Sequence, residues 1–238
     1  MKILALDFSS EARSVAVIEA GRGGAGSTAG VQASPVKART LSTVNETGAG
    51  ATRAFDLIER ALAQAGVIRQ EIERIVVGLG PGSYTGIRVA IAAAQGWQLA
   101  QGIGVVGLSS ADTLAAQAHE EGLRGVLHTV IDAQRNEVYL ASYELDSEGW
   151  HMTAPLRLAA LDEIRSLSAR GEMVVGPEAP RWCETGRVLF PQARHLGLMA
   201  AAGPPPVPGE SLEPIYLRPV TFVKAVSATP GSVRLWHA

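Results

Sequence analysis

Short apolar runs occur through the first half of the chain at the spacing expected of strands. The sequences ILALDF and SVAVIEA are rich in aliphatic and β-branched residues and are separated by the polar stretch SSEAR. They predict a β-hairpin, and a third strand is expected near residues 37–41. The runs RIVVGLG and GVVGL predict a fourth and a fifth strand. Between the third and fourth strands, apolar residues recur with a helical period and predict a helix that ends at Gly66, with Phe55, Ile58, Leu62 and Ala65 on one face.

The second half repeats this arrangement. The sequence VLHTVIDAQRNEVYLASYELD predicts two strands around a tight turn at residues 133–136. A further short strand, a helix near residues 161–170 and a strand at MVVG follow. Each half opens with a hairpin whose first strand ends in an aspartate, Asp7 or Asp132, which suggests a duplicated α/β unit. We expect one lobe over residues 1–106, a second over 107–212, and a tail over 213–238 that returns to the first lobe.

Two segments interrupt this pattern. Residues 21–35 are a Gly/Ser/Ala-rich stretch and predict a mobile hairpin tip. The sequence AGPPPVPGE predicts a break before the tail, and the last dozen residues are expected to be loosely held.

Composition narrows the class of protein. The chain has 238 residues, is 47% hydrophobic and 18% charged, and has a net charge of -2. These values fit a globular protein and provide no electrostatic footprint for strong nucleic-acid binding by this chain alone, although RNA bound jointly with a basic partner stays possible. The single cysteine, Cys183, cannot form an intramolecular disulfide, which favours a reducing cytoplasm. The N-terminus reads as a strand, and the most apolar window is too polar for a membrane span.

A glycine-rich turn, GLGPGSYTG, joins the fourth strand to a helix. A helix N-terminus with free N–H groups can hold an anion, so Gly80, Gly82 and Ser83 form a possible phosphate cradle near Asp7 and Asp132. The turn lacks the Lys-Ser/Thr of a P-loop and the spacing of a dinucleotide-binding fingerprint. A tight, well-capped connection between strand and helix is therefore the favoured interpretation.

The helix after this turn is built of small and apolar residues on nearly every face. Gly86, Ala90 and Ala94 carry little side-chain bulk, and Ile91 and Trp97 add apolar area. A helix that is apolar all round is buried all round, so its extra face is expected to be covered by another subunit. An arginine at Ala90 or Ala94 is then expected to leave the monomer folded and to abolish the contact.

Residues for metal or nucleophilic chemistry are not grouped in the sequence. The five histidines are never spaced i, i+3, i+4 or i+5, so no helix presents two imidazoles on one face. Cys183 has no activating base beside it, and no Gly-x-Ser-x-Gly motif occurs. We expect no metal ligands and no catalytic residues in this chain.

Four segments in order resemble the bacterial TsaB (YeaZ) family. They are MKILALDFSSEARSVAV, GLGPGSYTGIRVAIAAAQGWQLA, VIDAQRNEVYLASY and EPIYLRP, of which GPGSYTGIR is the most specific. The resemblance implies an actin-like ASKHA (ribonuclease H-like) α/β fold, with two lobes of mixed sheets flanked by helices. It implies a role in N6-threonylcarbamoylation of the adenosine beside the anticodon in tRNAs that read ANN codons.

The resemblance also implies partners. A TsaB-like chain is a non-catalytic scaffold that pairs with the catalytic paralog TsaD and recruits the ATPase TsaE, while TsaC supplies threonylcarbamoyl-AMP. ATP and a metal are then expected on the partner subunits, tRNA contact only through the complex, and a homodimer when the partner is absent. The metal-binding histidine pair of the catalytic paralog is missing from the matching helix here.

Carried onto this sequence, the contact helices cover residues 51–65 and 84–101. The residues expected at the partner interface are Gly86, Arg88, Ala90, Ile91, Ala94, Trp97, Phe55, Ile58 and Leu62. Two departures from the family pattern stand out. Phe8 replaces the usual threonine after Asp7, and the first helix lacks its usual opening residues.

Another class of protein stays open from the residues alone. An active ASKHA enzyme, such as an ATP-dependent kinase or transferase, would bind nucleotide between the lobes near Asp7, Gly80–Ser83 and Asp132. Submicromolar binding of ATP to the isolated chain would favour it.

Overall fold

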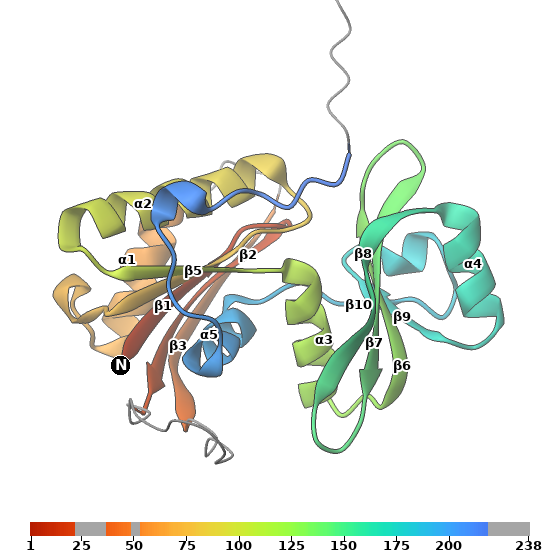
Figure 1. Ribbon diagram of the computed structural model, residues 1–238, viewed down its shortest axis with the longest axis horizontal. Coiled ribbons are helices and arrows are strands. Elements are labelled where there is room, and N and C mark those ends of the chain that lie inside the picture. Colours follow the sequence, from red (N-terminus) through yellow and green to blue (C-terminus); the bar gives the residue numbers. More distant parts are fainter. Residues whose placement is uncertain (22–36, 49–52, 219–238) are drawn as a thin grey trace, which may run out of the picture.

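The chain forms two lobes, each built on a five-stranded mixed sheet (Figure 1). The computed structural model describes residues 1–21, 37–48 and 53–218. The glycine-rich stretch predicted as a hairpin tip and the last residues of the tail lie outside this range. The first sheet has the order β3-β2-β1-β4-β5 and the second the order β10-β9-β6-β7-β8.

The first lobe contains the strands β1 (Lys2–Asp7), β2 (Ala12–Ala20), β3 (Ala38–Thr47), β4 (Arg74–Gly78) and β5 (Gly104–Leu108), with the helices α1 (Ala54–Ala65) and α2 (Tyr84–Gln101) and a short 3-10 turn, Arg69–Glu71. The second contains β6 (Gly125–Asp132), β7 (Glu137–Leu145), β8 (Trp150–Ala160), β9 (Met173–Gly176) and β10 (Arg187–Val188), with α3 (Ser110–Glu120), α4 (Leu161–Ala169) and the 3-10 turn Ala179–Arg181. The helix α5 (Ala193–Ala202) and a 3-10 turn at Gly209–Ser211 follow.

The predicted duplication is confirmed by the topology of the two sheets. In the first, β1 pairs antiparallel with β2, β2 antiparallel with β3, and β4 and β5 join in parallel. In the second, β6, β7, β8, β9 and β10 repeat this pattern strand for strand. The two aspartates that end the first strand of each half therefore occupy corresponding positions.

Helices cover both faces of the first sheet. Alternate residues of a strand point to opposite faces, and β1 is buried on both. Leu4 and Leu6 pack with α1 and α2, whereas Ile3 and Ala5 pack with α5. This two-sided burial explains why β1 reads as a continuous apolar run.

The chain returns to the first lobe earlier than predicted. Helix α5 packs on β1 and β2 of the first sheet through Ala193, Leu196 and Ala200. The expected boundary of the second lobe at residue 212 is therefore corrected to a point before Ala193. Helices α3 and α5 contact each other where the lobes meet (Figure 1).

After α5 the tail runs along α2 and then reaches the second lobe (Figure 1). Val207 bridges to Val105 of β5, and the Ile215 N–H donates to the Leu79 carbonyl at 2.8 Å. Arg218 donates to the Glu137 carboxylate at 2.7 Å in the second lobe. The tail thus touches both lobes.

Candidate partner-binding face and interlobe cleft

Helix α2 has two faces of similar composition but opposite exposure. On its inner face, Ala90 and Ala94 are fully buried and Gly86 is buried beside them. A Cβ atom at Gly86 would lie 2.0 Å from the Phe8 carbonyl oxygen. The inner face of α2 therefore packs directly on the chain after β1, and its small residues are used inside the lobe.

This burial corrects the residues predicted at the partner interface. Trp97 is half-buried against the same core, while Phe55 and Arg88 are exposed. An arginine at either buried alanine is expected to disrupt folding, contrary to the expectation from sequence. Six of the nine residues are buried in their own lobe and are not available to a partner in this structure: Gly86, Ala90, Ile91, Ala94, Ile58 and Leu62.

The outer face of α2 is small and apolar as well. Ala92, Gly96 and Leu99 are exposed, and Leu99 is 91% exposed. A Cβ atom at Gly96 would meet nothing within 4 Å. On the neighbouring helix α1, Phe55 is 68% exposed. Phe55 lies in the first turn of α1 and Leu99 in the last turn of α2, so they are two separate exposed apolar side chains. Exposed apolar surface of this kind is typical of a face that another protein covers.

A cleft of about 700 Å³ lies between the two lobes. Gly82 and Ser83 line it from the first lobe, and Asp132 lines it from the second. The structure thus brings together three of the five residues predicted for a nucleotide site. Asp7 and Gly80 are buried and do not line the cleft, which corrects their assignment.

Asp7 is fully buried, and its carboxylate is satisfied by neighbouring serines. The Ser9 N–H and hydroxyl donate to Oδ1 at 2.9 and 2.6 Å, and the Ser110 hydroxyl donates to Oδ2 at 3.0 Å. Burial raises the pKa of Asp7 above its ordinary value, and these hydrogen bonds offset part of that rise. Asp7 therefore joins the end of β1 to the start of α3 and does not face the cleft.

The glycine-rich turn is also used within the first lobe. The Ser83 N–H donates to the Ser9 carbonyl at 2.6 Å, and the Ser83 hydroxyl accepts from the Gly86 N–H at 3.3 Å. A Cβ atom at Gly82 would lie 2.1 Å from the Ser9 carbonyl oxygen. The glycine thus permits close approach of two backbone segments, as the favoured interpretation of a tight connection requires.

A left-handed turn forms the second-lobe wall of the cleft. Gln134, Arg135 and Asn136 have φ angles of 63°, 58° and 62°. Non-glycine residues rarely adopt this conformation. Asp132 Oδ1 accepts from the Gln134 N–H at 2.7 Å, and Arg218 donates to the Gln134 carbonyl at 3.3 Å. The sequence predicted the turn but did not reveal that the tail would hold it.

The cleft is lined by groups of both signs. Glu178 lies in it beside Asp132, whose N–H approaches the Glu178 carboxylate at 3.4 Å. Burial raises the pKa of Glu178, and the charge of Asp132 raises it further. Arg135 and Arg218 bring positive charge to the same cleft. Because carboxylates and arginines line the same cleft, the cleft does not carry the excess of positive charge that an anion-binding site needs.

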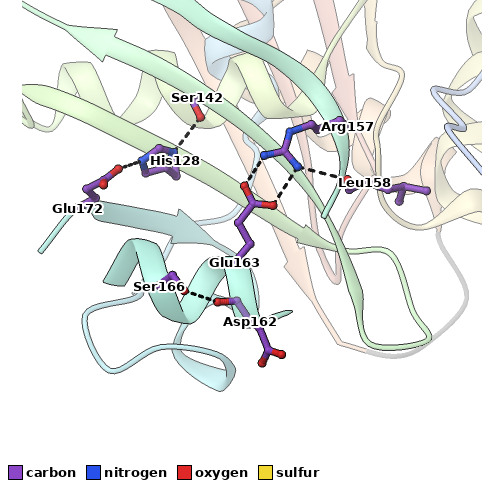
Figure 2. A network of polar contacts seen from close by, with 8 residues as sticks. All are labelled: His128, Ser142, Arg157, Leu158, Asp162, Glu163, Ser166 and Glu172. Carbon is purple, nitrogen blue, oxygen red and sulfur yellow. Dashed lines mark hydrogen bonds and ion pairs between the residues drawn. The ribbon is translucent and has the colours of Figure 1, made fainter. Parts of the chain in front are cut away.

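The second lobe contains a serine, a histidine and a glutamate in hydrogen-bond contact (Figure 2). His128 Nε2 lies 2.6 Å from a Glu172 carboxylate oxygen, and Nδ1 lies 2.8 Å from the Ser142 hydroxyl oxygen. His128 is 6% exposed, and none of the three residues lines the interlobe cleft. The group links β6 and β7 to Glu172, the residue before β9. Sequence reasoning missed it, although His128 and Ser142 are register partners in the predicted hairpin.

Among residues 1–21, 37–48 and 53–218, no group of three or more His, Cys, Asp or Glu side chains is placed to hold a metal ion. Within the same ranges, no helix has both the length and the apolar character to cross a bilayer.

Comparisons with known proteins agree with this architecture. The family model of TsaD, described as tRNA N6-adenosine threonylcarbamoyltransferase, matches residues 51–201. The tRNA threonylcarbamoyladenosine biosynthesis protein TsaB of Escherichia coli K12 is 32% identical over 185 residues, which cover 70% of this chain and 79% of that protein. The chain belongs to the TsaB (YeaZ) family.

Other relatives extend the match. The Haemophilus influenzae TsaB is 30% identical over 143 residues, 59% of this chain and 53% of that protein. The solved structure of YeaZ from Pseudomonas aeruginosa is 26% identical, with a TM-score of 0.70, and the match covers 91% of this chain and 99% of that one. The actin-like α/β fold implied by the sequence resemblance is confirmed by this TsaB (YeaZ) match and by the two mixed sheets.

Proposed function

We propose that this chain acts in the biosynthesis of threonylcarbamoyladenosine in tRNA as a non-catalytic partner of TsaD. The relatives with this family's name are biosynthesis proteins of that modification. In the proposed complex TsaD carries out the transfer and the ATPase TsaE joins the pair, so that ATP and metal belong to the partner subunits. This chain supplies a docking surface.

The exposed apolar outer face of α2 is the observation that carries the proposal. Leu99 is 91% exposed and Gly96 has open space above it, so a partner helix can approach the backbone closely there. Phe55, in the first turn of α1, is a further exposed apolar side chain of the same lobe. A second helix of small residues would bury these side chains and gain roughly 25 cal/mol for each Å² of apolar surface removed from water. When the partner is absent, the same face favours self-association.

The hydrogen bonds that Asp7 and Ser83 already make beside the interlobe cleft support a non-catalytic role. An enzyme that transfers phosphate in this fold needs a carboxylate free to act on a metal or a nucleotide. Here the Asp7 carboxylate accepts three hydrogen bonds from Ser9 and Ser110, and the Ser83 N–H is bound to a backbone carbonyl. These groups serve the packing of the first lobe, which leaves the cleft without an open phosphate cradle.

Association with TsaD is the direct test. The chain and TsaD from the same organism are mixed and analysed by light scattering behind a sizing column. Wild type is expected to form a complex. Ala92→Arg is expected to remain folded and to lose the complex, because Ala92 is exposed on the outer face. Ala169→Arg, at an exposed position on α4 of the second lobe, is the matched control and should bind as wild type does.

Two results would contradict the proposal. Full binding by Ala92→Arg would move the interface away from the outer face of α2.

Calorimetric titration of the isolated chain with ATP provides the second check. Submicromolar binding, together with turnover by the chain alone, would favour the ATP-dependent enzyme. Threonylcarbamoyladenosine should form only when both subunits are present.

A further inference from the structure

The last described residues of the chain, 213–218, cross from the first lobe to the second beside the interlobe cleft (Figure 1). We call this segment the strap. Tyr216 and Arg218 line the cleft itself, together with residues of both lobes. The strap therefore lies where a movement of one lobe against the other would change the distance that it spans.

At its start the strap is anchored to the first lobe. Leu212, just before it, is 6% exposed and belongs to the apolar core around α1 and α2. The Ile215 N–H donates to the Leu79 carbonyl at 2.8 Å. The rings of Tyr216 and of Tyr84, the first residue of α2, meet edge to face with centroids 6.2 Å apart. These contacts hold the first part of the strap on the first lobe.

At its end the strap is anchored to the second lobe through Arg218. Its Nη2 nitrogen lies 2.9 Å from the Ala133 carbonyl oxygen, 3.3 Å from that of Gln134 and 2.7 Å from a Glu137 carboxylate oxygen. The Arg218 side chain is 17% exposed. Hydrogen bonds of charged groups are stronger than those of neutral groups. Arg218 thus ties the strap to the left-handed turn that forms the second-lobe wall of the cleft.

The link between the two anchors is short. From Ile215 to Arg218 the backbone advances by three residues, which span at most about 11 Å when fully extended. The lobes also meet elsewhere, where Glu120 of α3 accepts two hydrogen bonds of 2.5 Å from Arg194 of α5. Among the described residues, those that line the cleft include none from α3 or α5. The lobes are therefore joined at two separate places, and opening of the cleft about the α3–α5 contact would break the strap contacts.

Two-lobed proteins commonly close by a hinge motion around a ligand that contacts both lobes. We propose that in this chain the strap takes the place of such a ligand and holds the cleft at its observed width. Release of Arg218 from the turn lets the lobes rotate apart about the contact between α3 and α5. The strap acts within one chain, so this inference goes beyond the proposed function and is tested without TsaD.

The distance between the lobes tests the strap directly. The full-length chain is spin-labelled at Ala63→Cys on α1 and Ala169→Cys on α4, two exposed positions, and Cys183→Ala removes the native thiol. Double electron–electron resonance then records the distribution of distances between the two labels. The labelled chain is diluted with unlabelled chain, so that only distances within one molecule are recorded. This parent chain, with its strap intact, should give one narrow distribution.

Arg218→Ala removes the second-lobe anchor. It should broaden the distribution and raise the ratio of open to closed molecules by about tenfold or more, because the hydrogen bonds of a charged group are lost. Tyr216→Ala weakens the first-lobe anchor and should change the distribution in the same direction by less. Arg39→Ala is the matched control. Arg39 pairs with Glu19 inside the first lobe, so its loss makes the same change in net charge and should leave the parent distribution unchanged.

Thermal unfolding of each variant checks that the chain stays folded. A folded Arg218→Ala variant with the parent distribution would overturn the inference, since the cleft would keep its width without the strap. Equal broadening in Arg39→Ala would also overturn it. If Arg218→Ala does not fold, Tyr216→Ala decides, because Tyr216 is 55% exposed and its truncation leaves the core intact; the parent distribution in that variant would overturn the inference. Association with TsaD, measured separately, bears on the proposed function alone.

Discussion

Two glycines on α2 allow the packing of this helix to be measured with one chemical change. Gly86 lies on the inner face, where an added Cβ would be 2.0 Å from the Phe8 carbonyl oxygen. Gly96 lies on the outer face, where an added Cβ would meet nothing within 4 Å. Neither has a positive φ. Alanine is therefore tolerated by the local backbone at both sites, and only the surroundings differ.

Two contributions determine the expected change in the free energy of unfolding of each variant. Replacement of glycine by alanine inside a helix stabilises it by about 1 kcal/mol. Gly96→Ala should gain this amount and raise the melting temperature by roughly 2–4 °C in a chain of this size. Gly86→Ala has the same gain in helix propensity. Its added Cβ also forces α2 away from the chain after β1, and such overpacking destabilises a protein by about 1–3 kcal/mol. The upper end applies because the contact is a backbone oxygen.

Urea unfolding followed by tryptophan fluorescence, at one protein concentration, measures both variants. The propensity gain is common to the two, so the difference between their free energies of unfolding isolates the steric cost. We expect Gly86→Ala to be less stable than Gly96→Ala by about 2–3 kcal/mol. A difference below about 0.5 kcal/mol would refute the assignment of Gly86 to the inner face, since substitutions at surface positions usually change the free energy of unfolding by no more than that.

Two ionisable groups yield further predictions. Burial raises the pKa of Asp7 above 3.8, so wild type loses stability as the pH rises through the raised pKa. Asp7→Asn stays neutral and should lack this loss, so its free energy of unfolding relative to wild type should rise as the pH rises above 3.8 and level off beyond the raised pKa of Asp7; a flat difference would argue against the buried charge. Hydrogen bonds from Arg194, with a further contribution from His195, lower the pKa of Glu120 from 4.5 to about 2. Glu120→Gln should therefore destabilise the chain at neutral pH by about 1 kcal/mol; this figure is smaller than the pKa shift alone implies, because solvent screens the partly exposed carboxylate. The difference in stability from wild type should vanish as the pH falls towards 2.

The hydrophobic pattern predicted the sheets well because their strands are buried in a regular way. The apolar run of β1 and the polar turns between hairpins follow directly from burial on two faces. The duplication was visible for the same reason. Asp7 and Asp132 end corresponding strands, and the sheet order repeats around them.

The faces of α2 were not predictable from periodicity. Ala90 and Ala94 are buried, whereas Ala92 and Gly96 are exposed, yet all four are small. A helix with similar residues on every side has no polar face to mark the solvent. Sequence reasoning located the helix and its apolar character, and only the packing on Phe8 decides which side is inward.

The candidate site was partly predicted. Gly82, Ser83 and Asp132 line the cleft as expected; Asp132 ends β6, and Gly82 and Ser83 lie in the turn between β4 and α2. Asp7 was considered for a possible nucleotide site but does not line the cleft; one of its partners, Ser110, is 103 residues away in sequence. The return of the tail to the first lobe was predicted, but its contact with α2 was not, since Gly209 meets Gln98 across 111 residues. Contacts of this range leave no local pattern.

The position of α5 makes the second lobe an insertion within the first, with a consequence for synthesis on the ribosome. The strands β1 to β5 emerge first, but among the described residues the face formed by Ile3, Ala5 and Ile18 is covered by Leu196 and its neighbours in α5. Domains fold largely as units, the earlier one first, as the chain emerges. Here the order is reversed: the later lobe completes its sheet while the earlier one still exposes an apolar face. The first 106 residues made alone should therefore aggregate, whereas a chain that extends through Ala202 carries the helix that covers them.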